Sequence, residues 1–125
     1  MMRGLSVSDI IILHQKVIDK TGGSHGIRDI GLIESAVSRA YATFGGNDLY
    51  ETVEEKIAAT AYSLVSNHGF VDGNKRIGIA AMLLLLQLNG YKLQYSQQEL
   101  IDLGLGLAAG NLDENDIQRW IKAHR

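Results

Sequence analysis

A short segment near the middle of the chain gathers residue types that could carry out acid–base and anion-binding chemistry. Its sequence is Asn67-His68-Gly69-Phe70-Val71-Asp72-Gly73-Asn74-Lys75-Arg76. It lies between an alanine-rich helical pattern, 54–66, and the most apolar stretch of the chain, 77–86. A polar turn between two buried helices costs desolvation free energy unless its groups are bonded, so we expect this turn to have a function.

The second half of this segment has the features of an anion site. Gly73 allows a tight turn, and the helix that begins at Asn74 leaves unpaired backbone N–H groups at the positive end of its dipole. Lys75 and Arg76 add positive charge at the helix end where cations are unfavourable for stability, which indicates a bound anion, phosphate being the best candidate. The alternative is that both side chains simply extend into solvent, as an arbitrary Lys-Arg pair usually does.

His68 and Asp72 could supply the chemistry beside such a site. An imidazole is suited to take a proton from a hydroxyl near neutral pH, and a carboxylate beside phosphates is suited to hold Mg²⁺. The apolar face of the preceding helix, extended by four residues, predicts that His68 points to the edge of the core. A histidine at a helix end is more often a structural group, which is the alternative. Phe70 is interpreted as a core anchor.

Composition limits the remaining possibilities. The chain has 125 residues, 46% of them hydrophobic, a formal net charge of −2, and neither cysteine nor proline. This favours one globular domain, 1–125, with no disulfide, no cysteine-based metal site and no general attraction to nucleic acid, so no direct nucleic-acid binding is expected. No apolar run is long enough to span a membrane, and we expect a soluble, cytoplasmic protein. Neither the P-loop order nor a zincin motif occurs.

Hydrophobic periodicity and capping signals predict an all-α fold of about six helices around one hydrophobic central helix. Capping boxes are expected at Ser6 and Asp9, at Thr52 and Glu55, and at Ser96 and Glu99, and Asp113 is expected to cap the last helix. The central helix is predicted to run from Lys75 to Asn89 and to stop at Gly90. Residues 44–50 are predicted to form a loop, and 91–95 an extended segment or brief edge strand.

Two blocks of this sequence resemble the Fic/Doc family. The first is His68-x-Phe70-x-Asp72-Gly73-Asn74-Lys75-Arg76, and the second is Gly22-Gly23-Ser24-His25-Gly26-Ile27-Arg28-Asp29-Ile30-Gly31-Leu32-Ile33-Glu34-Ser35-Ala36. The Fic branch is usually written H-P-F-x-[D/E]-G-N-G-R-x-x-R. This chain departs from it at Gly69, Lys75 and Ile79, and its lysine is similar to that of the Doc (death-on-curing) toxin branch.

The resemblance implies an all-α enzyme whose motif loop binds ATP and Mg²⁺. Carried over by position, His68 would be the base, Asp72 would bind Mg²⁺, and Asn74 and Arg76 would hold phosphates. Gly73 and Lys75 belong to the expected phosphate site because of the tight turn and the positive charge described above. Doc-type toxins are taken to transfer the terminal phosphate to a hydroxyl of a translation factor, elongation factor Tu, whereas Fic enzymes transfer AMP.

A lysine in place of the second motif glycine occupies the volume that a diphosphate would need, so the sequence favours phosphate transfer over AMP transfer. A non-enzymatic interaction module of the same fold is the third possibility. The chain lacks the inhibitory [S/T]-x-x-x-E-[G/N] motif, so an antitoxin acting in trans is the expected inhibitor. Arg28, and with less support His25, could form a flap that contacts substrate or antitoxin.

Overall fold

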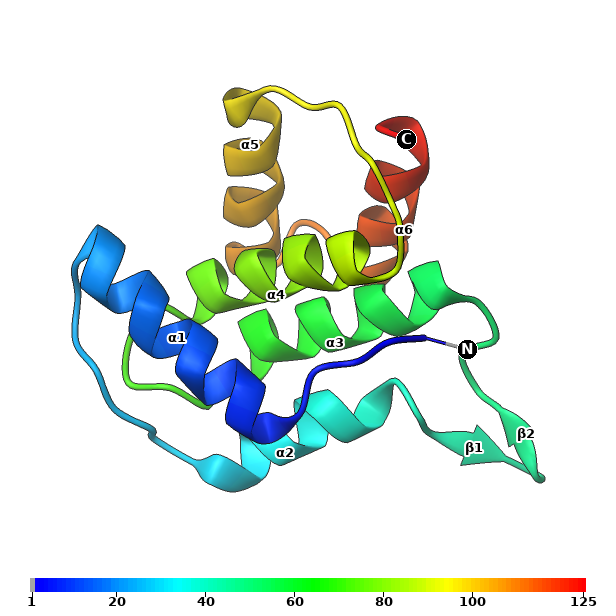
Figure 1. The fold of residues 1–125 in the computed structure, drawn as a ribbon, viewed down its shortest axis with the longest axis horizontal. Coiled ribbons are helices and arrows are strands. Elements are labelled where there is room, and N and C mark those ends of the chain that lie inside the picture. The colour runs from blue at the N-terminus through cyan, green and yellow to red at the C-terminus, as the bar shows by residue number, and fades with distance from the viewer. Residues whose placement is uncertain (1) are drawn as a thin grey trace.

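The computed structural model describes residues 2–125, which form six helices and one short hairpin (Figure 1). The elements in chain order are α1 (Val7–Thr21), α2 (Ile30–Arg39), β1 (Thr43–Phe44), β2 (Asn47–Asp48), α3 (Val53–Asn67), α4 (Asn74–Leu88), α5 (Gln97–Ala108) and α6 (Glu114–Ala123). The predicted all-α fold is confirmed. No helix within residues 2–125 combines the length and the hydropathy that crossing a bilayer would require.

The helix starts follow the capping signals of the sequence. Ser6 and Ser96 open α1 and α5 as complete capping boxes, and Asp113 opens α6 in the same way. Thr52 caps α3 by accepting a bond from the N–H of Glu55, although the Glu55 carboxylate bonds the Thr52 hydroxyl instead of its N–H. These side chains satisfy N–H groups that no helix can satisfy internally, which is why local sequence predicts them well.

The centre of the molecule is the pair α3 and α4, which lie side by side in Figure 1 with α1 and α2 on one side and α5 and α6 on the other. The predicted central helix is therefore confirmed as α4, but it shares this position with α3. Gly78 lets the two helices approach closely, because a Cβ there would lie 2.4 Å from Val65 Cγ2 and 3.0 Å from the Ala61 carbonyl oxygen. The helix stops as predicted, with Gly90 at a φ of 81°.

Two segments differ from the sequence predictions. Residues 43–48 form an antiparallel hairpin, whose turn is made by Gly45 and Gly46 with φ of 60° and 83°. Two residues with positive φ form the tight turn that matches strand twist, and this turn signal was overlooked because the flanking strands are so short. The segment 91–95 contains no strand, since no partner strand lies beside it. The N–H of Gln94 instead donates to the carbonyl of His124, 2.8 Å away.

Candidate active site

The motif loop begins where α3 ends, at His68. This residue has φ 53° and ψ 49°, and it is the one non-glycine residue with positive φ among residues 2–125. The left-handed backbone takes it out of the helical register, so its side chain is exposed and makes no hydrogen bond within the described part of the chain. The expectation that His68 points to the core edge was wrong for this reason. The exposed ring is available to an incoming hydroxyl group.

Phe70 anchors the loop, as predicted. It is 2% exposed, and its ring stacks on that of His14 with 3.8 Å between the centroids. Asn74 bonds the same residue twice: its Oδ1 accepts from the Phe70 N–H and its Nδ2 donates to the Phe70 carbonyl, both at 3.0 Å. The Asn74 carboxamide therefore shapes the loop, and its predicted contact with phosphate would come from its backbone N–H.

The start of α4 is the one helix start within residues 2–125 that no side chain caps. Gly73 stands at the cap position with φ 76°, and a Cβ there would lie 3.0 Å from Ile18 Cδ1. The backbone bond of this turn runs from the N–H of Ile77 to the Gly73 carbonyl, at 2.8 Å. The three preceding N–H groups, of residues 74–76, have no acceptor in the described chain, and they form the type of site that binds anions at helix starts.

Asp72 lies directly before this turn. Its carboxylate accepts hydrogen bonds from the N–H of Ser24 at 3.0 Å and of Gly73 at 2.7 Å, and Arg76 Nη2 is 3.5 Å away. These two backbone donors, Ser24 first, lower the pKa of Asp72 below its ordinary value, and the charge of Arg76 lowers it further. Asp72 is therefore ionised at neutral pH, as a metal ligand must be.

The donor set around Asp72 fits Mg²⁺ if a nucleotide supplies further ligands. Residues 2–125 contain no cluster of three or more His, Asp or Glu side chains that could hold a metal ion. Mg²⁺ commonly takes one or two carboxylates and completes its shell with substrate phosphates and water. The side chain of Asp72 is 43% exposed, so Mg²⁺ could bind here together with a nucleotide.

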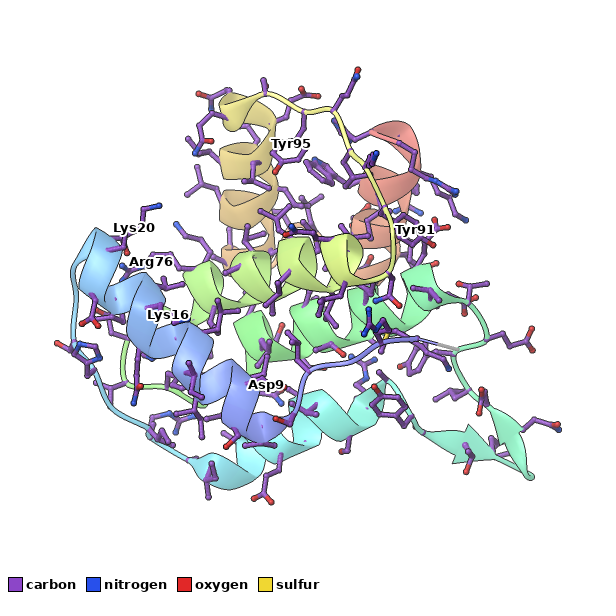
Figure 2. All side chains as sticks on the ribbon, viewed as in Figure 1. Asp9, Lys16, Lys20, Arg76, Tyr91 and Tyr95 are labelled. Carbon is purple, nitrogen blue, oxygen red and sulfur yellow. The ribbon has the colours of Figure 1, made fainter. Side chains whose placement is uncertain are left out.

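Lys75 and Arg76 follow different courses from the first turn of α4. Arg76 Nη1 donates to Thr21 Oγ1 and to the Gly22 carbonyl, both at 2.6 Å, which fixes it against the end of α1. Figure 2 shows Arg76 at the same end of the molecule as Lys20. Lys75 packs its stem near Gly104 of α5, and its ammonium group has no partner within residues 2–125. Both side chains line a mostly apolar groove of about 370 Å³ between α1, α4 and α5.

Arg28 binds the end of α3 and the first residue of the motif loop. Its Nε donates to the His68 carbonyl at 2.6 Å, and its Nη2 donates to the Asn67 carbonyl at 3.1 Å. The backbone of residues 26–29 pairs with the motif loop, since Ile27 and Phe70 form an antiparallel bridge. Arg28 thus holds the end of α3 in this structure, and its predicted contact with substrate or antitoxin stays a prediction. His25 points away to pair with Asp19 at 2.8 Å.

Sequence reasoning missed three contributors to this site: His14, Thr21 and Ser24. His14 could have been found, because it lies midway between Ile10 and Ile18 on the buried stripe of α1. A polar residue on such a stripe needs a partner. Thr21, the last residue of α1, and Ser24, in the loop that follows, contact Arg76 and Asp72, and no local sequence signal predicts these contacts.

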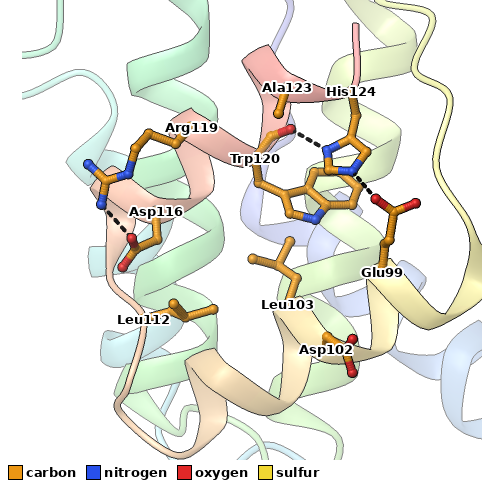
Figure 3. A pocket seen from close by; sticks show the side chains of 9 residues that line it. All are labelled: Glu99, Asp102, Leu103, Leu112, Asp116, Arg119, Trp120, Ala123 and His124. Carbon is orange, nitrogen blue, oxygen red and sulfur yellow. Dashed lines mark hydrogen bonds and ion pairs between the residues drawn. The ribbon is translucent and has the colours of Figure 1, made fainter.

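A larger hollow, of about 440 Å³, lies between α5 and α6 (Figure 3). No residue of the motif lines it. Four of its charged groups form two pairs, His124 Nε2 with Glu99 at 2.6 Å and Arg119 with Asp116, and Asp102 accepts a hydrogen bond from Gln98. The chemistry-bearing residues therefore lie elsewhere than this hollow, at the start of α4.

The fold and this site define a class: all-α domains in which a glycine opens an uncapped central helix and an exposed histidine begins the loop before it. Residues 4–86, more than half of the chain, match the sequence model of the Fic/DOC family. The chain belongs to this family.

Two relatives show how far the similarity extends. The chain is 33% identical over 119 residues to "Protein kinase doc" of Escherichia phage P1, a match that covers 93% of this chain and 90% of the relative. It is 46% identical over 72 residues to "Toxin Doc" of Mycolicibacterium smegmatis. That second match covers 58% of this chain and only 55% of the relative, about half its length.

Proposed function

We propose that this protein is a toxin of the Fic/Doc type that transfers the terminal phosphate of ATP to a hydroxyl group of a target protein. The observation that carries the proposal is the uncapped start of α4, which has three free N–H groups and two cations in its first turn and the ionised Asp72 directly before it. The exposed His68 lies four residues before Asp72, at the start of the same loop. The names of the two relatives, a toxin and a protein kinase, agree with this function. By resemblance, the target is a translation factor, elongation factor Tu.

The reaction assigns one role to each group. His68 takes the proton of the target hydroxyl as its oxygen forms a bond to the γ-phosphorus, while the bond from that phosphorus to the β,γ-bridging oxygen breaks and ADP leaves. The free N–H groups of α4, with Lys75 and Arg76, stabilise the negative charge on the phosphate oxygens. Mg²⁺, bound by Asp72 and the phosphates, would neutralise further charge.

Two features favour phosphate transfer over AMP transfer. Lys75 occupies the second position of α4, where a glycine would let a diphosphate reach the backbone. Ile79 stands where the Fic motif has its last arginine, so this position provides no cation for a second phosphate. AMP transfer remains the second candidate, because the nest of N–H groups at α4 would bind an α-phosphate by the same contacts.

ATP labelled at either the α- or the γ-phosphate distinguishes the two reactions, with purified elongation factor Tu and a cell extract as substrates. Only the γ-label should reach protein. His68→Ala should reduce the transfer by about 10²- to 10⁴-fold, the usual contribution of a general base. Because His68 is exposed and its side chain is unbonded, the Tm should change little. His124→Gln, far from the motif, serves as the histidine control, and label from the α-phosphate alone would refute phosphate transfer.

An antitoxin in trans is the partner that fits a toxin without an inhibitory helix of its own. An amphipathic segment could be laid on this protein in the helix-in-groove mode. Growth arrest on expression, relieved by co-expression of a neighbouring antitoxin gene, would support this part of the proposal. Because ATP and translation factors are cytoplasmic, we propose the cytoplasm as the site of action.

A further inference from the structure

We propose that His14 is a positioning residue, which fixes the peptide that leads into α4 and so sets the geometry of the phosphate and Mg²⁺ site. This inference rests on the proposed function. His14 belongs to α1 and lies far from the motif in sequence. It is nevertheless the side chain that joins the two halves of the motif loop from inside, because it contacts both Phe70 and Asp72.

His14 has the contacts expected of a residue that holds the motif loop in place. The residue is 2% exposed, its ring stacks on Phe70 with 9° between the planes, and its Nε2 lies 2.7 Å from the Asp72 carbonyl oxygen. A Cβ on Gly73 would lie 3.4 Å from the same Nε2, so the ring also packs directly against the turn. A carbonyl oxygen can only accept, so Nε2 must carry the proton and donate it.

This bond fixes one peptide unit from both ends. The carbonyl of the Asp72–Gly73 peptide accepts from His14, and the N–H of the same peptide donates to Asp72 Oδ1 at 2.7 Å. The plane of this peptide determines the direction in which the next N–H groups of α4 point. It also sets the position from which the Asp72 carboxylate leaves the backbone. His14 therefore acts on the candidate phosphate donors and on the candidate Mg²⁺ ligand without touching substrate.

A matched pair of variants isolates the hydrogen bond. His14→Gln places an N–H donor at the same number of bonds from Cα as the Nε2 of His14. His14→Met has nearly the same shape as the glutamine variant but no donor. Both variants lose the ring that stacks on Phe70. Gln brings an additional buried oxygen that lacks a partner, so it should be the less stable variant of the two. Positioning predicts that the less stable variant is the more active one. A merely structural role predicts the reverse.

The first measurement needs no catalysis. Amide hydrogen exchange of the bonded N–H groups of Phe70, Val71, Gly73 and Ile77, followed by NMR on the free protein, should be about 10-fold faster in His14→Met than in wild type, and within about 3-fold of wild type in His14→Gln. Ile10→Val, a buried α1 variant away from Asp72, controls for general loosening and should leave these amides unchanged relative to the rest of the core. Equal exchange in the Gln and Met variants would overturn the inference.

The second measurement uses the γ-label assay. His14→Met should reduce kcat by about 10- to 100-fold and raise the half-saturating Mg²⁺ concentration, the usual range for outer-shell groups, and His14→Gln should restore both. Activity that follows the Tm across the three variants would refute positioning. If wild-type protein transfers no label at all, the proposed function fails, while the exchange measurement still decides the role of His14. His14→Phe, which keeps the ring without the donor, replaces His14→Met if that variant does not fold.

Discussion

Helices α4 and α5 begin in opposite ways. Ser96 and Glu99 close the start of α5 as a reciprocal capping box with bonds of 2.9 and 3.1 Å, and the carboxylate lies in the first turn, where the helix dipole favours it. The start of α4 has no side-chain cap, and its first turn contains two cations and no acid. The start of α5 is closed by its own side chains, and the start of α4 leaves its first N–H groups without a side-chain partner.

The open end of α4 persists because tertiary packing holds the helix. Ile77, Gly78, Ala81 and Met82 are buried against neighbouring elements, and the turn before the helix is held by His14, Asn74 and Ser24. Most helical stability in proteins comes from such packing and little from the helix ends. A site of this kind therefore costs stability locally and depends on contacts that are distant in sequence.

The largest effect expected from this comparison concerns the glycines inside the two helices. Gly78→Ala in α4 should destabilise the protein by about 1–3 kcal/mol, because its Cβ would lie 2.4 Å from Val65 Cγ2 in a tightly packed interface. Gly104→Ala in α5 should stabilise it by about 0.5–1 kcal/mol, because the nearest atom to its Cβ, Lys75 Cδ, is 3.5 Å away. Urea unfolding measures both. Equal effects would show that α4 is not held by close packing on α3.

Local chemistry explains why the outline of the fold could be predicted and the details of the site could not. Capping boxes such as that of Ser96, and the stop at Gly90, are encoded within a few residues, and the structure confirms them. The orientation of His68 depends on a left-handed backbone that Arg28 holds from the loop between α1 and α2. The helical stripe rule fails there, since it assumes that the helix continues.

The same difference between local and distant contacts applies to the candidate site. The motif itself, from His68 to Arg76, could be predicted from residue types and spacing. Its supports could not, because they come from α1 and from the glycine loop that follows it. Thr21 binds Arg76 and Ser24 binds Asp72 across 55 and 48 residues of sequence. Asn74, expected to reach phosphate, instead holds Phe70 with its side chain, a choice that only the folded loop determines.

A smaller effect is expected from a positive charge in the first turn of α4 compared with one in the last turn of α6. Lys75→Ala removes a cation from the first turn of α4 and should stabilise the free protein by about 0.3–1 kcal/mol at low salt, whereas Lys122→Ala, in the last turn of α6, should destabilise it by a similar amount. Adding inorganic phosphate should raise the Tm of wild type more than that of Lys75→Ala, because the ammonium of Lys75 would bind it. If the two lysine variants shift the Tm in the same direction, the start of α4 is not an anion site.

The smallest expected effect on stability concerns the capped start of α5. The Ser96 N–H, followed by the His124 side chain, lowers the pKa of Glu99 from 4.5 to about 2. The Trp120 carbonyl, followed by Glu99, raises the pKa of His124 above 6.5. Both ring nitrogens of His124 face acceptors, at 2.7 and 2.6 Å, so the charged ring is the favoured form. The ion pair should therefore contribute fully to the stability of the fold between the ordinary pKa values of the two groups, from pH 4.5 to pH 6.5.

Glu99→Gln keeps an oxygen for the capping bond and removes the charge, so it isolates this pair. The Glu99 contribution is lost as pH falls from 4.5 toward 2, and the His124 contribution is lost as pH rises through its raised folded pKa. The Tm difference between wild type and Glu99→Gln should therefore be largest between these limits and narrow on the alkaline side. Asp116→Asn, whose partner Arg119 does not titrate, should give a flat difference from about pH 5 to 9. An equally flat profile for Glu99→Gln would mean that the charge of His124 adds no stability through Glu99.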